Sequence, residues 1–195
     1  MLRLLAAAAT LVLSSTLAQA HPGDATHSLL HGFAHPIGGL DHALAMVAVG
    51  LLAFQLGGRA LWLVPGAFVT VMAAGAVAGA FGLVPPLTEI GIAASVLVLG
   101  AAVALRLGVP ATTAALVVGA FAIFHGAAHG AEMPQTAAGL AYGVGFVLAT
   151  ALLHACGISA GLLVGRLDRT AGHYAVRSLG AATAVVGGVL TLASL

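Results

Sequence analysis

Apolar stretches long enough to cross a lipid bilayer dominate this chain of 195 residues. There are six such stretches, each of at least 19 residues, separated by short segments rich in Gly, Pro or Arg. A spanning helix needs about 20 apolar residues, so each stretch predicts one transmembrane helix. The predicted spans are residues 36–56, 60–82, 88–106, 110–130, 136–163 and 174–194. We therefore predict an all-α, polytopic membrane bundle in which residues 21–195 form a single six-helix domain.

The composition excludes a water-soluble fold and several classes of partner. Hydrophobic residues make up 61% of the chain and charged residues only 6%, whereas soluble domains carry about 25% charged residues. The solvent must therefore be the lipid bilayer. All six cations are arginines, which are too few for a nucleic-acid surface, and the absence of lysine excludes a Walker A site for a nucleotide. Cys156 is the sole cysteine, which excludes an intrachain disulfide and a Cys-rich metal site.

Residues 1–20 are typical of a cleaved signal peptide. Arg3 is followed by an apolar run from Leu4 to Leu13 and then by a small-residue cleavage site that ends at Ala20. This run is about half the length of a spanning helix, which favours cleavage over a retained helix. Cleavage would leave His21 as the mature N-terminus.

The arginines predict how the bundle is oriented. They lie in the connections that follow the first, third and fifth apolar stretches, whereas the other connections contain no Lys or Arg. The cations concerned are Arg59, Arg106, Arg166, Arg169 and Arg177. Under the positive-inside rule these connections are cytoplasmic, so both mature termini are periplasmic and the protein lies in a bacterial inner membrane.

Histidine is the most frequent ionisable residue, with nine in the chain, and two groups of histidines lie at the outer ends of spans. Span one begins HPIGGLDHALAM, with Pro36 expected in the first helical turn. On a continuous helix, His35, His42 and Met46 share one face, with Asp41 beside them. Span four ends FHGAAHGAEMP. There His125, His129 and Glu132 are spaced four and three residues apart and also share a face.

These two groups predict a metal site. Imidazoles suit Ni, Co, Cu and Zn, and carboxylates offset the charge of a divalent ion. The alternative is that each histidine is an interfacial residue with a hydrated ring. The joint pattern favours a metal, because each ionisable group inside a bilayer costs about 2–3 kcal/mol without a partner. The predicted ligands are His35, Asp41, His42, His125, His129 and Glu132.

Four further histidines allow two interpretations each. His154 lies deep in span five, where it is either a packed histidine or a station on a metal pathway. The segment before span one contains His21, His27 and His31, which either capture metal outside the membrane or belong to a flexible polar tail.

Three strings, HPIGGLDHALAMVAVGLLA, FHGAAHGAE and LLHACG, resemble the HupE/UreJ family of hydrogenase- and urease-associated membrane proteins. The similarity covers essentially the whole mature chain. It implies secondary uptake of nickel, or of cobalt in some members, for the maturation of metalloenzymes such as hydrogenase or urease. By the same analogy, an essential first motif contains His35, Asp41 and His42, and a second motif contains His125, His129 and Glu132.

We therefore expect a permease for Ni²⁺ or Co²⁺ that holds no permanent cofactor, and two other classes compete with it. A metal-binding accessory protein or sensor would hold the ion without passing it. A membrane metalloenzyme is a weaker alternative: the sequence lacks the adjacent-histidine boxes of di-iron oxygenases. The string GISAG at 157–161 matches a serine-nucleophile motif, but it lies in an apolar stretch rather than at a strand-to-helix turn. We expect no enzyme.

We predict that metal uptake slows as the external pH falls from about 7.5 to about 5.5, because imidazole binds metal only when neutral and its ordinary pKa is about 6.5. The measurement is the initial rate of uptake by vesicles at constant metal concentration. A rate that does not change over this range would contradict histidine ligation.

Overall fold

A computed structural model describes residues 25–133, 136–167 and 169–195 of the protein, and these residues form seven α-helices and no strand. The helices are α2 (Ala25–Gly38), α3 (Leu40–Leu56), α4 (Ala60–Ala80), α5 (Thr88–Leu105), α6 (Ala111–Glu132), α7 (Ala137–Leu167) and α8 (Arg169–Ala193). The predicted all-α class is confirmed. The predicted signal peptide and His21 lie outside the described residues.

Five helices of the described chain, α4 to α8, are long and apolar enough to cross a membrane. A sixth span results if α2 and α3 are counted together, although the two are bent by 78° relative to each other. The bundle therefore has five or six candidate spans, and the higher number agrees with the sequence prediction.

The break between α2 and α3 corrects the prediction for span one. We expected one helix starting near Pro36, but α2 already begins at Ala25 and contains Pro36 near its end. The chain turns at Gly39, whose backbone is extended with φ −83° and ψ 116°. Proline removes one helical hydrogen bond, and each glycine costs about 1 kcal/mol in a helix interior. Pro36 followed by Gly38 and Gly39 therefore ends the helix.

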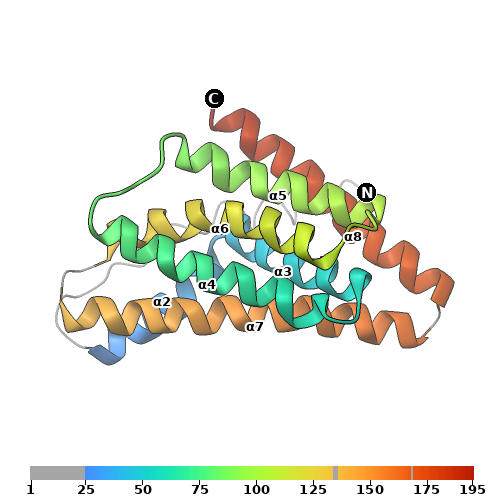
Figure 1. Ribbon diagram of the computed structural model, residues 1–195, viewed down its shortest axis with the longest axis horizontal. Coiled ribbons are helices and arrows are strands. Elements are labelled where there is room, and N and C mark those ends of the chain that lie inside the picture. Colours follow the sequence, from blue (N-terminus) through green and yellow to red (C-terminus); the bar gives the residue numbers. More distant parts are fainter. Residues whose placement is uncertain (1–24, 134–135, 168) are drawn as a thin grey trace, which may run out of the picture.

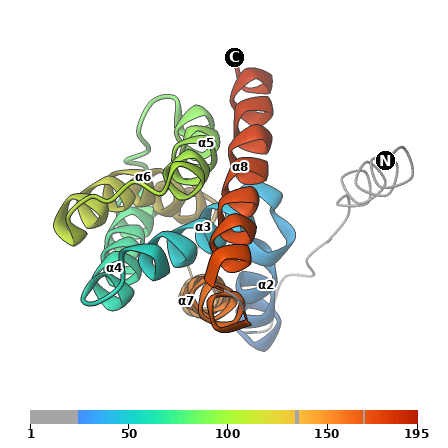
Figure 2. The same cartoon turned by 90° about the vertical axis from the view of Figure 1, so that its right-hand side faces the viewer.

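The helices associate as pairs, with α4 along α6, α5 along α8, and both α2 and α3 along α7 (Figures 1 and 2). Residues 25–35, which the sequence left open as a metal-capturing segment or a flexible tail, thus belong to a helix packed on the bundle. Small residues allow these close approaches, as is common for helices in membranes.

Glycine sets the spacing between α4 and α6. A Cβ atom at Gly126 would overlap the carbonyl oxygen of Met72, and one at Gly130 would overlap that of Ala76. Each of these glycines directly follows a histidine in the string FHGAAHG. Successive helical residues point in directions about 100° apart. Gly126 and Gly130 therefore face α4, while His125 and His129 point to a different side of α6.

Substituting Gly126 tests this packing. We predict that Gly126→Ala lowers the stability of the detergent-solubilised protein by about 1–3 kcal/mol, because the new methyl group meets backbone that must move. Gly66→Ala is the matched control on α4, since a Cβ there has no described atom within 4 Å. Thermal unfolding would measure both variants. Equal melting temperatures for the two would contradict the close approach.

Candidate metal site

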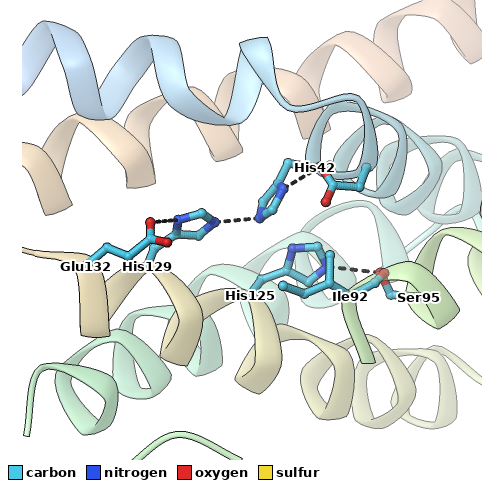
Figure 3. Close-up of polar contacts among 7 residues, drawn as sticks. His42, Ile92, Ser95, His125, His129 and Glu132 are labelled. Carbon is cyan, nitrogen blue, oxygen red and sulfur yellow. Dashed lines mark hydrogen bonds and ion pairs between the residues drawn. The ribbon is translucent and has the colours of Figure 1, made fainter. Parts of the chain in front are cut away.

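Four histidine rings from three helices converge in the bundle: His35 of α2, His42 of α3, and His125 and His129 of α6. The ring centroid of His42 lies 4.5 Å from that of His129 and 4.7 Å from that of His125. The ring centroids of His35 and His129 are 4.6 Å apart. His42, His125 and His129 are 6%, 0% and 5% exposed. The structure thus brings together the histidines of both predicted groups, and Figure 3 shows three of them.

Asp41 orients the ring of His42. Its Oδ1 atom lies 2.8 Å from His42 Nδ1 and accepts a second hydrogen bond, also of 2.8 Å, from the backbone N–H of His42. Asp41 stands in the first turn of α3, where the helix dipole stabilises a negative charge. The carboxylate therefore keeps the proton of His42 on Nδ1 and leaves the lone pair on Nε2. This is the carboxylate–histidine arrangement that orients metal ligands in many proteins.

The freed nitrogen of His42 faces a second imidazole. His42 Nε2 and His129 Nε2 are 2.5 Å apart (Figure 3). Two ring nitrogens this close need a positive centre between them, because two lone pairs repel. A proton on His129 Nε2 fills this need in the metal-free protein. A metal ion bound by both nitrogens would displace that proton, as metal binding to histidine generally does, and would move the two rings apart, because metal–nitrogen bonds are about 2.0–2.1 Å long.

Ser95 of α5 holds the third ring. Its hydroxyl donates to the carbonyl of Ile92 at 2.6 Å, so its oxygen accepts from His125 Nε2 at 2.9 Å. This places the proton of His125 on Nε2 and the lone pair on Nδ1. The Nδ1 atom is buried and has no hydrogen-bond partner among the described residues. It is therefore available as a metal ligand.

Glu132 lies at the exposed rim of the site. One carboxylate oxygen is 3.8 Å from His129 Nδ1, and 67% of the Glu132 side chain is exposed. Ligand atoms of His35, His129 and Glu132 all lie within 4.8 Å of one another. Glu132 can therefore meet an arriving ion first, while the deeper rings replace its water.

Aromatic side chains form the walls of the site. Phe146 of α7 lies 4.4 Å from the ring centroid of His129, and Tyr142 lies 6.1 Å from that of His35. Phe68 of α4 lies 5.6 Å from His125. These rings exclude water, which strengthens electrostatic interactions with a bound cation.

The structure places the other candidate residues outside the four-ring cluster. We expected His35, His42 and Met46 on one helical face, but the break at Gly39 puts His35 on a different helix, and Met46 is fully buried in the apolar core. His31 lies at the rim, 6.2 Å from the ring of His35. His154 packs on Phe68, at 5.2 Å. His27 lies in α2, but its side chain, like the whole of His21, is outside the described part.

The sequence interpretation missed Ser95 and Phe68. In the sequence, Ser95 differs from its neighbours only as a polar residue inside an apolar span. Nothing in the sequence distinguishes Phe68 from other apolar residues. The serine of the string GISAG lies within the long helix α7, as expected, and so lacks the turn that a nucleophilic serine requires.

Comparison with known proteins agrees with the resemblance noted in the sequence. The model of the family described as "HupE / UreJ protein" matches residues 9–190. Protein HupE of Rhizobium leguminosarum bv. viciae is 46% identical over 175 residues, which cover 90% of each chain. No solved structure matches this chain.

Ser95 provides a test of the site that leaves every proposed ligand in place. We predict that Ser95→Ala weakens metal binding by about 10- to 100-fold, because His125 loses the partner that holds its ring and tautomer. Ser194→Ala is the matched control, since that hydroxyl also donates to a helix carbonyl but is exposed. Equilibrium dialysis of the purified variants against Ni²⁺ would measure the affinities. Equal affinities would contradict the proposed role of Ser95 in holding His125 for the ion.

Proposed function

The chain belongs to the HupE/UreJ family, and we propose that it is a secondary permease for a divalent transition metal, Ni²⁺ in the first place and Co²⁺ in the second. In this proposal the imported ion supplies the maturation of a metalloenzyme such as hydrogenase or urease. The observation that carries the proposal is the convergence of His35, His42, His125 and His129 inside an apolar bundle.

The ligand chemistry supports a transition metal over Mg²⁺ or Ca²⁺. Those two ions prefer oxygen ligands, whereas imidazole nitrogens suit Ni, Co, Cu and Zn. Asp41 and Glu132 add two negative charges, which offset the two positive charges of the ion in a medium of low dielectric constant. A buried cluster of neutral imidazoles would not by itself hold a dication as well.

The positions of the helix ends in the bundle support import. α6 ends and α7 begins at the left-hand end of the bundle, whereas α4 begins and α5 and α7 end at the right-hand end (Figure 1). His129 and Glu132 stand in the last turn of α6, so the cluster lies toward the end opposite to the start of α4. Arg59, Arg106 and Arg166 belong to these latter helix ends. The positive-inside rule then makes the arginine end cytoplasmic and the cluster periplasmic, in the inner membrane.

The membrane potential is sufficient to drive the ion inward. Moving two positive charges down an inside-negative potential releases about 4–5 kcal/mol per 100 mV. The permease therefore requires no nucleotide and acts on the ion without chemical change, as a carrier and not an enzyme.

Flux into proteoliposomes tests the proposal. We predict that wild-type protein accumulates Ni²⁺ or Co²⁺ in proportion to internal volume, and that His42→Ala and His129→Ala reduce this flux to the level of empty vesicles. His173→Leu is the control, because His173 is exposed on α8, and it should retain full flux.

Two results would contradict the proposal. Normal flux in both His42→Ala and His129→Ala would show that these histidines are not needed for transport. Binding of ion in a fixed ratio to protein, without accumulation in wild-type vesicles, would instead identify a metal-binding accessory protein or sensor.

A further inference from the structure

A row of buried side chains on α7 extends from the metal site toward the other end of the bundle. Tyr142, Phe146, Thr150 and His154 are spaced four residues apart, so they share one face of the helix. They are 7%, 4%, 0% and 2% exposed. Phe146 lies against the ring of His129, and His154 lies eight residues farther, about 12 Å along the helix axis. The row therefore connects the cluster with His154.

His154 has no structural explanation within its surroundings. Neither Nδ1 nor Nε2 has a hydrogen-bond partner among the described residues, although both atoms are fully buried. An unsatisfied buried donor costs about 1–3 kcal/mol, and buried polar side chains in proteins are normally hydrogen-bonded. A histidine that serves packing alone would therefore be expected to have a partner. The ring instead leaves a nitrogen lone pair free for another ligand.

Phe68 contacts both His154 and the cluster. Its ring centroid lies 5.6 Å from that of His125 and 5.2 Å from that of His154, and the residue is fully buried. The three rings come from three helices: α4, α6 and α7. Each of the two histidines has a buried ring nitrogen without a partner. Phe68 thus contacts two imidazoles that can each bind an ion.

A second contact between α4 and α7 places a thioether and a hydroxyl one helical turn away along these helices. The hydroxyl of Thr150 lies 3.7 Å from the sulfur of Met72, and both residues are almost fully buried. Thr150 is one turn before His154 on α7, and Met72 is one turn after Phe68 on α4. The neighbourhood of His154 therefore contains a thioether and a hydroxyl. A thioether with an imidazole selects transition metals over Mg²⁺ and Ca²⁺.

We propose that His154 is an inner ligand for the transported metal, a second station that an ion reaches from His125 past the ring of Phe68. This inference rests on the proposed permease function and adds the inward route to it. The outer cluster captures the ion, and His154, which lies farther along α7 toward Arg166, receives it next.

Separate measurements of binding and flux test the inner station. In His154→Leu, we expect metal affinity at the outer cluster to be retained and flux into proteoliposomes to fall by about tenfold or more, since a ligand has been removed from the route. His173→Leu, the same substitution at the exposed histidine of α8, should leave both unchanged. Thermal unfolding of both variants checks that they are folded.

The other outcomes distinguish two kinds of failure. If wild-type protein accumulates ion and His154→Leu does so at the same rate, the inner station is overturned and the permease stands. Loss of outer binding in a folded His154→Leu protein would also overturn it, because His154 would then belong to the cluster. If wild-type protein does not accumulate ion, the proposed function itself fails.

A spectroscopic variant tests position 154 even if His154→Leu does not fold. In His154→Cys on a Cys156→Ala background, bound Co²⁺ should give a cobalt–thiolate charge-transfer band, because cysteine binds metals as the thiolate. Cys156→Ala alone is the control and should give no such band. Absence of the band in His154→Cys while the outer cluster binds Co²⁺ would show that ions do not reach this position.

Discussion

The contact between His42 and His129 is the interaction on which the proposed site depends. Their Nε2 atoms are 2.5 Å apart, although the residues belong to different helices and stand 87 positions apart in the chain. α6 is held against α4 through Gly126 and Gly130. α3 is held against α7 in a similar way, because Gly50 and Gly157 meet each other's backbone. The α3–α7 pair packs against the α4–α6 pair, and this packing brings Nε2 of His42 close to Nε2 of His129.

The charges around this contact explain how an apolar bundle can hold a dication. Asp41 fixes the tautomer of His42, and Ser95 fixes that of His125, so each ring presents a defined lone pair. Such partners of the ligands matter nearly as much as the ligands in metal sites generally. Asp41 is 2.8 Å from a ring nitrogen and 32% exposed in its side chain, so it can orient His42 and contribute charge. Its direct binding to the ion, which the sequence suggests, stays a prediction.

The sequence predicted the membrane-spanning helices and the two groups of histidines, because both depend on patterns between residues that are close in sequence. Apolar length defines a span, and the four-residue spacing of His125 and His129 places them on one face of α6. The break at Gly39 was missed because Pro36 was placed in the first turn of span one, where proline is favourable, so that Pro36, Gly38 and Gly39 were not interpreted as the end of a preceding helix. Ser95 and Phe68 could not be assigned to the site, since their roles arise from contacts between helices that are distant in sequence.

X-ray absorption spectroscopy of the protein loaded with one equivalent of Ni²⁺ tests the central claim most directly. Imidazole rings bound to a metal give a characteristic multiple-scattering pattern, from which the number of histidine ligands follows. Convergence of His35, His42, His125 and His129 on one ion predicts a nitrogen and oxygen shell with at least three imidazoles. A shell of water and carboxylate oxygens with no more than one imidazole would contradict it.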